Sequence, residues 1–430
     1  MQENRTTNPV DDAAPSTGPH AGALPPRARA GSGRRRSLPG TAILVGLILA
    51  CTLSLPWMFT PAPGEPAPRY NSGSPSAGRL PPWWWPARPD ALARIAALAD
   101  DETVAAISTA RGISAAQVRD SRDPAVLKAL AENSTYAREK WRSLLGTDAL
   151  GRSLFFRCLA GGGISIAVGL AAAAISVTIG TLYGALAGYV GGTIDAVMMR
   201  FVDVLYGLPY VLLVVLLAVA ADSLAERFTR SRIESAAAAR ENYIAHEFTK
   251  FDPADRTDEL RQRLADEALE KYGAGELGTA ARTAIDLVTL LVAIGGVSWL
   301  TMARVVRGQV LSLRNQPFVE AARSVGAGPG RIFFRHLLPN LVGPITVYAT
   351  LTVPQAILQE SFLSFLGIGV KPPLPSWGGL ASDGLSELNP YQSDWWLLLF
   401  PCLLLAVTLV ALNLAGESLR ASFDPKGRGR

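Results

Sequence analysis

The sequence predicts an all-α, polytopic membrane protein, and its composition, apolar blocks and charge placement all lead to that class. Of its 430 residues, 49% are hydrophobic and only 18% are charged, and the mean hydropathy is +0.22. Soluble domains carry about 25% charged residues. A helix needs about 20 apolar residues to cross the hydrocarbon, and such blocks occur at residues 41–59, 164–190, 194–220, 284–303, 341–360 and 395–414. We therefore expect six transmembrane helices.

The chain begins with a segment unlike the rest. Residues 1–38 are rich in Pro, Gly, Ala and Arg and lack periodicity, which predicts a disordered basic tail before a first transmembrane helix at 39–59. A rival interpretation is a cleaved secretory or lipoprotein signal, because "RRRSLPGTAILVGLILAC" has a basic head, an apolar core and Cys51. Leu49 is large for such a cleavage site and the apolar run continues to Phe59, which favours an uncleaved helix.

Residues 60–157 are predicted to form an extracytoplasmic loop with a small helical subdomain. Three tryptophans in "PPWWWP" suit a membrane interface. The loop ends in "LGTDALGR", where Asp148 and Arg152 lie four residues apart and can pair, and where Thr147 or Asp148 can instead cap the second helix. Substrate contact is a further interpretation of this element, whose candidate residues are Gly146, Thr147, Asp148, Gly151 and Arg152.

The remaining transmembrane region, residues 158–425, contains a second polar insert at 222–282. Acids and bases three or four residues apart in "RTDELRQRLADEALEKYG" predict a solvated helix there. Gly- and Ala-rich blocks predict closely packed helices. Prolines in or beside the spans are either ordinary kinks or hinges of a gate: Pro209, Pro344, Pro354 and Pro401.

Basic residues fix the expected orientation. Arginines gather before the first span at Arg27, Arg29 and 34–36, six more follow the fourth span against the single acid Glu320, and the chain ends in "RASFDPKGRGR". With six spans these segments share one side, which the positive-inside rule makes cytoplasmic. Both termini and the segment 304–340 are therefore predicted in the cytoplasm.

Within that segment, "FVEAARSVGAGPGRIFFRHLLPN" predicts a bent helical hairpin, broken after Val325 and stopped at Pro339. Ala321 and Ala322 keep one face thin, and Gly326 lets the backbone turn. An apolar ridge and paired charges suit a docking element, with the ridge expected at Phe333, Phe334, Leu337 and Leu338. An amphipathic connector lying on anionic lipid is an equally good interpretation of these residues.

Acids and amides near the spans are candidates for a pathway or gate. Glu360 and Gln355 lie toward the outer end of the fifth span, where Glu360 either lines an outer gate or pairs with a neighbouring helix. Asp195 is expected at the interface, whereas Asp203 lies deeper and is expected to bond within the bundle.

Other activities lack their residues. The three cysteines and three histidines are dispersed, which gives neither a metal spacing nor a disulfide framework, and we find no catalytic constellation. No GxxxxGK[ST] occurs, and "GAGPGRI" lacks the Lys and Ser/Thr of a phosphate loop, so ATP would have to bind another chain. Charge in both large loops is mixed, which gives nucleic-acid binding little support.

Several motifs together identify a family. "EAARSVGAGPGRIFFRHLLPN" resembles the coupling loop of importer-type ABC transporter permeases, with Glu320, Ala321, Ala322, Gly326, Arg331, Leu338 and Pro339 in its pattern. Further stretches resemble the second permease subunit of dipeptide/oligopeptide importers: "LGTDALGRSLFFRCLAGGGISIAVGL", "GGTIDAVMMRFVDVLYGLP", "ARVVRGQVLSLRNQPFVEAA", "SFLSFLGIGVKPPLPSWGGL" and "FPCLLLAVTLVALNLAGESLRASFDP". The similarity covers most of residues 145–425 except the insert.

The resemblance implies a type I ABC importer permease in the cell inner membrane, pairing with a homologous permease. It also implies two ATPase subunits, which carry ATP and Mg, and an extracytoplasmic solute-binding protein, with no cofactor in this chain. The two large loops of this chain, at residues 60–144 and 222–282, are longer than the family pattern has them. They either enlarge the docking surface for the binding protein or merely decorate it. The transported solute stays open among dipeptides, oligopeptides and nickel chelates. A stand-alone secondary transporter or a non-transport scaffold is the alternative, although we see no convincing repeat of the spans.

Overall fold

The computed structural model describes residues 33–423 except 64, 139, 141 and 389–392. Within these ranges the regular elements are helices, and the extended pairings are isolated bridges. The all-α class is therefore confirmed. The predicted disorder of residues 1–32 lies outside the described residues, while residues 33–38 of the same predicted tail are helical because α1 (Gly33–Met58) begins there.

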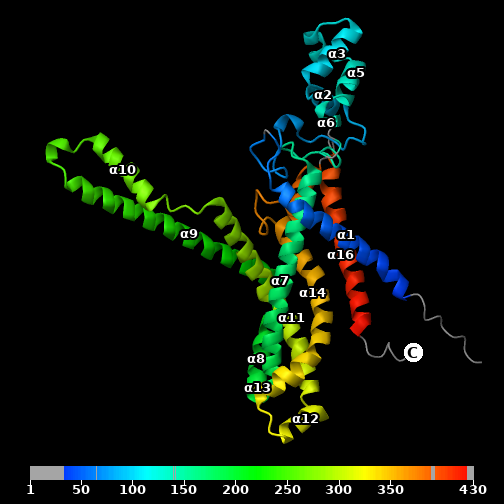
Figure 1. Ribbon diagram of the computed structural model, residues 1–430, viewed down its shortest axis with the longest axis vertical. Coiled ribbons are helices and arrows are strands. Elements are labelled where there is room, and N and C mark those ends of the chain that lie inside the picture. Colours follow the sequence, from blue (N-terminus) through cyan, green and yellow to red (C-terminus); the bar gives the residue numbers. More distant parts are fainter. Residues whose placement is uncertain (1–32, 64, 139, 141, 389–392, 424–430) are drawn as a thin grey trace, which may run out of the picture.

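Long apolar helices run side by side along the length of the molecule (Figure 1). Three are the unbroken helices α7 (Leu154–Val190), α11 (Thr279–Leu313) and α16 (Trp396–Phe423). A fourth apolar helix spans Pro329–Phe365 and contains α13 (Pro329–Ile332), a π-helical turn (Phe333–Leu337) and α14 (Leu338–Phe365). Each is long and apolar enough to cross a bilayer.

The other predicted spans are less regular. Helices α8 (Gly192–Tyr206) and α9 (Tyr210–Thr249) meet at 92° and together qualify as one bent span. Pro209 stands at the bend, as the N-cap of α9. The apolar part of α1 covers Ala42–Met58, 17 residues or about 26 Å at 1.5 Å per residue. The described residues thus hold four clear spans and a fifth bent one, and a total of six stays a prediction.

Helix α7 begins at Leu154, ten residues before the predicted start at residue 164. The predicted apolar block begins only after the glycines at 161–163, and Gly has a low propensity for an isolated helix. In the fold these glycines are buried, and a Cβ on Gly162 would come within 2.4 Å of the Trp377 ring. Close packing of α7 therefore requires glycine and outweighs its low helix propensity.

The loop predicted to be extracytoplasmic, which we call the outer loop, folds into a small helical subdomain at one end of the molecule (Figure 1). Its packed core contains Val104, Val118, Val126 and Leu130. Capping explains two of its helix starts: Asp100 accepts a hydrogen bond from the Thr103 N–H, and Ser114 forms a capping box. Its helices are α2 (Pro89–Ala97), α3 (Asp101–Arg111), α4 (Ala115–Arg119), α5 (Pro124–Glu132) and α6 (Thr135–Arg138), preceded by the 3-10 turn η1 (Pro75–Ala77).

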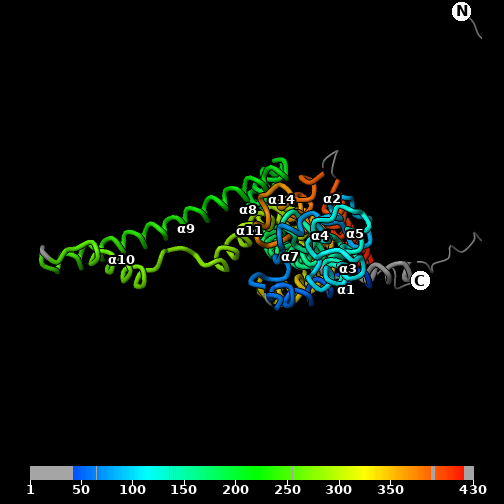
Figure 2. Tube along the Cα trace, turned by 90° about the horizontal axis from the view of Figure 1, so that it is seen from above, coloured from blue at the N-terminus to red at the C-terminus, as the bar shows by residue number. Residues whose placement is uncertain are grey.

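The second insert forms a helical hairpin that projects sideways from the bundle (Figures 1 and 2). Helix α9 continues well past the predicted span end at residue 220, and α10 (Asp258–Tyr272), which follows the 3-10 turn η2 (Pro253–Asp255), packs back on it through buried Leu264 and Ala268. The predicted solvated helix is therefore present. At the hairpin base, Lys371 bridges Asp222 at 3.1 Å and Asp286 at 3.2 Å.

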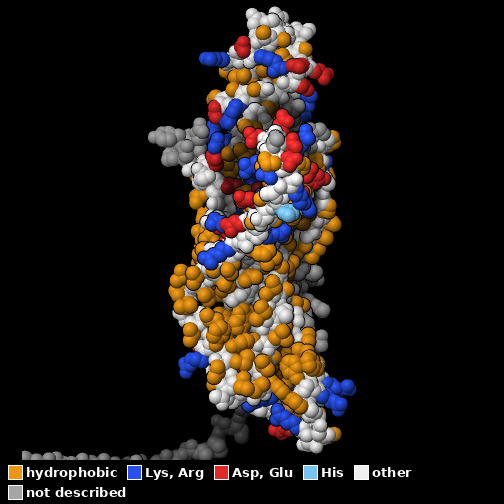
Figure 3. All heavy atoms as spheres, turned by 90° about the vertical axis from the view of Figure 1, so that its left-hand side faces the viewer, with side chains coloured by type: hydrophobic (Ala, Val, Ile, Leu, Met, Phe, Trp, Pro, Cys, Tyr) orange, Lys and Arg blue, Asp and Glu red, His pale blue; other side chains and the backbone are white. Residues whose placement is uncertain are grey.

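The surface shows how the bundle meets its surroundings. A broad apolar band covers the lower half of the face in Figure 3, and charged side chains gather above it and at its lower end. Helix α12 (Pro317–Ser324) lies at that lower end, while α15 (Trp377–Ser386) lies near the upper end, where its Trp377 is fully buried. Such a band between polar ends is typical of a membrane protein.

Candidate functional site

The hairpin between α11 and α14 turns through a Schellman motif at the end of α12. The Ala327 N–H donates to the Ala322 carbonyl at 3.0 Å, and the Gly326 N–H donates to the Arg323 carbonyl at 2.9 Å. Gly326 takes φ +81 at the turn, a left-handed conformation that Gly adopts at little cost. Ala322 and Ala327 both pack on the same apolar cluster. Gly326 thus makes the turn, as the sequence analysis expected.

Buried side chains hold this hairpin on the bundle. Val319 of α12, Ile332 of α13 and Leu337 of the π turn are at most 2% exposed and join a cluster with Val306 and Val310 of α11. Three separate points of the hairpin are therefore anchored. The loop is a fixed structure rather than a loose connector.

Other hairpin side chains face outward. Val325 is 89% exposed and Phe334 is 69% exposed. Glu320 is exposed, and it forms no ion pair within the described residues. Ala321 and Arg331 are exposed too, whereas Leu338 is half-buried. The outward surface therefore combines an acidic side chain, a basic side chain and isolated apolar side chains.

Two expectations for the hairpin are wrong. The four-residue ridge does not form, because Leu337 points into the bundle and only Phe334 of the four is strongly exposed. The chain does not stop at Pro339 either, since α14 begins at Leu338 and runs through that proline. Pro is tolerated in a first helical turn, and the preceding π turn, in which the Leu338 N–H donates to the Phe333 carbonyl, widens the backbone before the proline ring.

A pocket of about 540 Å³ lies where the α8–α9 bend faces α11 and α14. We call it the elbow pocket. Its polar lining is uncharged and consists of Tyr206, Tyr210, Ser298, Thr301, Tyr348, Thr352, Gln355 and Gln359. Its apolar walls include Leu208, Val297 and Leu351. Of the predicted pathway candidates Gln355, Glu360 and Asp203, only Gln355 is among the described residues that line it.

Hydrogen bonds connect three helices inside the elbow pocket. The Tyr210 hydroxyl of α9 lies 3.0 Å from the Ser298 Oγ of α11, and Ser298 donates to Gln359 Oε1 of α14 at 3.1 Å. Sequence reasoning missed these three residues. Gln355 and Gln359 lie four residues apart inside an apolar block, and helices place such pairs on one face. That spacing is the signal that could have found them.

The acidic candidates lie elsewhere. Glu360 is fully buried and accepts hydrogen bonds from Ser361 and Ser364, so it faces the interior of the bundle and does not line the pocket. Asp203 is half exposed and accepts from Arg304 at 2.8 Å, while Arg304 stacks over the Tyr206 ring at 4.0 Å. Asp195, expected at the interface, is buried in a bidentate pair with Arg307.

Asp148, Arg152 and Arg157 form a compact hydrogen-bonded group, which we call the Asp148 cluster. Asp148 is buried and accepts from the backbone N–H groups of Leu150 and Arg152 at 2.9 Å. Its other oxygen accepts from Arg152 at 2.7 Å and from Arg157 at 2.5 Å. The predicted Asp148–Arg152 pair therefore exists. Neither Thr147 nor Asp148 caps α7, since Ser153 is the N-cap residue and Thr147 instead bonds to Leu80 and Ala77.

Two glycines allow the backbone turns beside the Asp148 cluster. Gly146 takes φ +84 and Gly151 takes φ +75. A Cβ on Gly151 would lie 1.9 Å from the Ser74 carbonyl oxygen, so the Pro- and Ser-rich linker passes directly over it. The motif thus fastens the outer loop to the start of α7.

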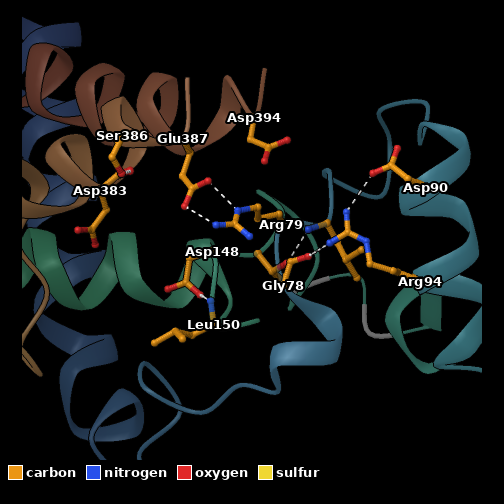
Figure 4. Close-up of polar contacts among 12 residues, drawn as sticks. Gly78, Arg79, Asp90, Arg94, Asp148, Leu150, Asp383, Ser386, Glu387 and Asp394 are labelled. Atoms are coloured by element: carbon orange, nitrogen blue, oxygen red, sulfur yellow. Dashed lines mark hydrogen bonds and ion pairs between the residues drawn. The ribbon is translucent and has the colours of Figure 1, made fainter. Parts of the chain in front are cut away.

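Further ion pairs near the Asp148 cluster reach α15 and the residue that follows it. The Arg79 guanidinium points at Glu387 and donates two hydrogen bonds to its carboxylate (Figure 4). Arg94 donates hydrogen bonds to the Gly78 carbonyl and to Asp90. Arg157 also faces Asp383 at 3.6 Å. Burial raises the pKa of Asp383, and the charges of Arg157 and Arg152 oppose that shift. Within the described residues, no group of three His, Cys, Asp or Glu side chains is arranged to hold a metal ion.

Comparisons with known proteins agree with one another. Residues 180–429 match the family described as "Binding-protein-dependent transport system inner membrane component". The oligopeptide transport system permease protein OppC of Haemophilus influenzae is 39% identical over 283 residues, which cover 66% of this chain and 70% of that protein. The dipeptide transport system permease protein DppC of Bacillus subtilis is also 39% identical, covering 66% and 68%. Escherichia coli OppC is 40% identical, covering 66% and 72%.

Proposed function

Because this chain belongs to the family of binding-protein-dependent transport inner membrane components, we propose that it is a peptide permease subunit of an ABC importer. It is a multi-pass membrane protein that supplies helices rather than a catalytic site. With a homologous permease it forms the pathway for a dipeptide, an oligopeptide or a related small solute. ATP and Mg bind two partner ATPase subunits, and an extracytoplasmic binding protein delivers the solute.

The anchored hairpin carries this proposal. Val319, Ile332 and Leu337 fix it on the bundle, while Glu320 and Val325 face away. A docking element needs this division, because a rigid base transmits force and an exposed acid beside apolar groups gives a partner both register and contact area. The ATPase subunit is the partner that would seat on it. Its movement on ATP binding would pass through α11 and α14 to the bundle.

Orientation and domain roles follow from that docking. The hairpin end of the bundle, with residues 304–340, then lies in the cytoplasm, and the charge pattern of the sequence puts both termini on the same side of the membrane. The outer subdomain and the insert at 222–282 lie on the opposite side. The Asp148 cluster has a structural role, since both carboxylate oxygens of Asp148 already accept hydrogen bonds from Arg152, Arg157 and backbone N–H groups. Contact with the binding protein falls to the loops around it.

Reconstitution tests this function. The chain, its homologous permease and the two ATPases are placed in liposomes, with binding protein outside and labelled tri-alanine as the probe. We expect uptake only with ATP and binding protein present. Uptake driven by an ion gradient without the ATPases would instead establish a stand-alone secondary transporter.

A further inference from the structure

The elbow pocket has a lining suited to one chemical class of ligand. Its polar groups are phenols, hydroxyls and amides, and no Asp, Glu, Lys, Arg or His is among the residues that line it. Arg304, which lies over the ring of Tyr206, is paired with Asp203 at 2.8 Å, so that its charge is compensated. Glu360 turns its carboxylate toward serine hydroxyls instead. The pocket therefore presents hydrogen-bonding groups without a net charge.

Several of these groups are free to bind a ligand. Within the described residues, the Gln355 amide and the hydroxyls of Tyr206 and Tyr348 form no hydrogen bond to the protein, although Tyr206 carries the Arg304 guanidinium on its ring. By contrast, Tyr210, Ser298 and Gln359 bond to one another. The free groups come from two helices, Tyr206 from α8 and both Tyr348 and Gln355 from α14, and all three line the pocket. A polar group beside apolar walls gains from a partner that enters.

A peptide backbone matches this lining. Each residue of a peptide offers an N–H donor and a C=O acceptor, and an amide such as Gln355 can serve both. Side-chain charge finds no opposite charge in the pocket to attract it and no like charge to repel it. A chelated metal ion likewise finds none of the carboxylate, imidazole or thiolate groups that hold metals.

We propose that the elbow pocket is a transit site that binds passing peptides through their backbone amides and does not discriminate by side-chain charge. This inference rests on the proposed transport function and assigns Tyr206, Tyr348 and Gln355 as its contact residues. Selection of peptides by charge would then be made by the binding protein, before the peptide enters the membrane. The same neutrality lets one pathway serve peptides of different composition.

Placing a charge in the pocket tests the proposal. Gln355→Lys and Gln355→Glu are compared with the wild type in ATP-driven uptake of Ala-Ala-Ala, Ala-Lys-Ala and Ala-Glu-Ala, each on saturating binding protein. The wild-type maximal rates should agree within about twofold. A fixed charge within roughly 6 Å of the peptide should separate the two charged peptides by about tenfold, in opposite senses for the two variants. Gln262→Lys and Gln262→Glu, at an exposed amide on α10 outside the pocket, should leave the rates together.

The outcomes distinguish the two levels of the proposal. Uptake that is absent for every peptide in the wild type would overturn the transport function itself. ATP-driven uptake whose charge preference is unchanged by both Gln355 variants would overturn the transit site alone.

A photo-cross-linking measurement avoids reliance on charged variants. Tyr348→p-benzoylphenylalanine exchanges one aromatic side chain for another and should capture labelled tri-alanine during turnover. The same exchange at Tyr272, an exposed position on α10, should capture none. Capture at neither position during active uptake would contradict the transit site.

Discussion

Replacing Gly326 by Ala isolates the backbone requirement of the hairpin turn. A Cβ at this position would meet no atom within 4 Å, so the change adds no clash. The cost comes from φ +81, because a left-handed conformation costs an L-residue about 1–2 kcal/mol. Gly330→Ala is the matched control, since its Cβ also meets nothing within 4 Å and Gly330 lies in α13 without a positive φ. There Ala should be neutral or favourable by about 0.5–1 kcal/mol.

Hydrogen exchange reads this difference at the turn itself. The Gly326 and Ala327 amides donate the two bonds of the motif, and a loss of about 1 kcal/mol makes their opening about fivefold more frequent. Gly326→Ala should accelerate exchange of residues 326 and 327 by that factor, while Gly330→Ala should leave it unchanged or slower. Equal exchange rates in the two variants would refute the Schellman account of the hairpin.

Three further predictions concern the outer face. Gly151→Ala should lower the free energy of unfolding by roughly 3 kcal/mol, since it adds both a clash with the Ser74 carbonyl and strain at φ +75; a loss in detergent melts no larger than that of Gly112→Ala, whose Cβ meets nothing, would contradict this. Asp148→Asn removes the carboxylate that the buried Arg157 contacts at 2.5 Å and leaves it only the more distant Asp383, so it should lower the free energy of unfolding by about 3 kcal/mol, whereas Glu132→Gln in the exposed pair with Lys128 should change stability by less than about 0.5 kcal/mol. The hydrogen bond from Ser72 lowers the pKa of Glu65, and a hydrogen bond and charge from Arg142 help it to outweigh the opposing effect of burial. The stabilisation from Glu65 should therefore be complete above the usual pKa of 4.5 and lost as the pH falls below it, so melting temperatures of Glu65→Gln should fall less steeply on acidification, and parallel curves would count against this reading.

Local signals in the sequence were enough for much of the hairpin. The break after Val325 and the turn at Gly326 follow from Gly and Pro chemistry, which acts within a few residues. The Asp148–Arg152 pair and the solvated helix now seen as α10 followed in the same way from four-residue spacing. Each of these features depends on neighbours along the chain.

Features that depend on distant packing were not predictable. The early start of α7 requires Trp377 to close on Gly162, and the passage of the helix through Pro339 requires a π turn that the residue pattern does not signal. The elbow pocket is lined by residues of α8, α9, α11 and α14 that lie far apart in sequence. Glu360 was a candidate because it is an ionisable residue in an apolar span, yet in the fold it is buried and accepts hydrogen bonds from neighbouring serines.

Co-purification tests the central claim most directly. The chain is expressed with its homologous permease and the ATPases, with and without Glu320→Arg plus Gly326→Leu, and the ATPase retained in detergent is measured. Glu132→Arg plus Gly112→Leu makes the same chemical changes at an exposed acid and a positive-φ glycine of the outer subdomain. The account predicts that the hairpin variant loses the ATPase while keeping the homologous permease, and that the control keeps both. Full retention of the ATPase by the hairpin variant, or no ATPase bound to the unaltered chain, would contradict it.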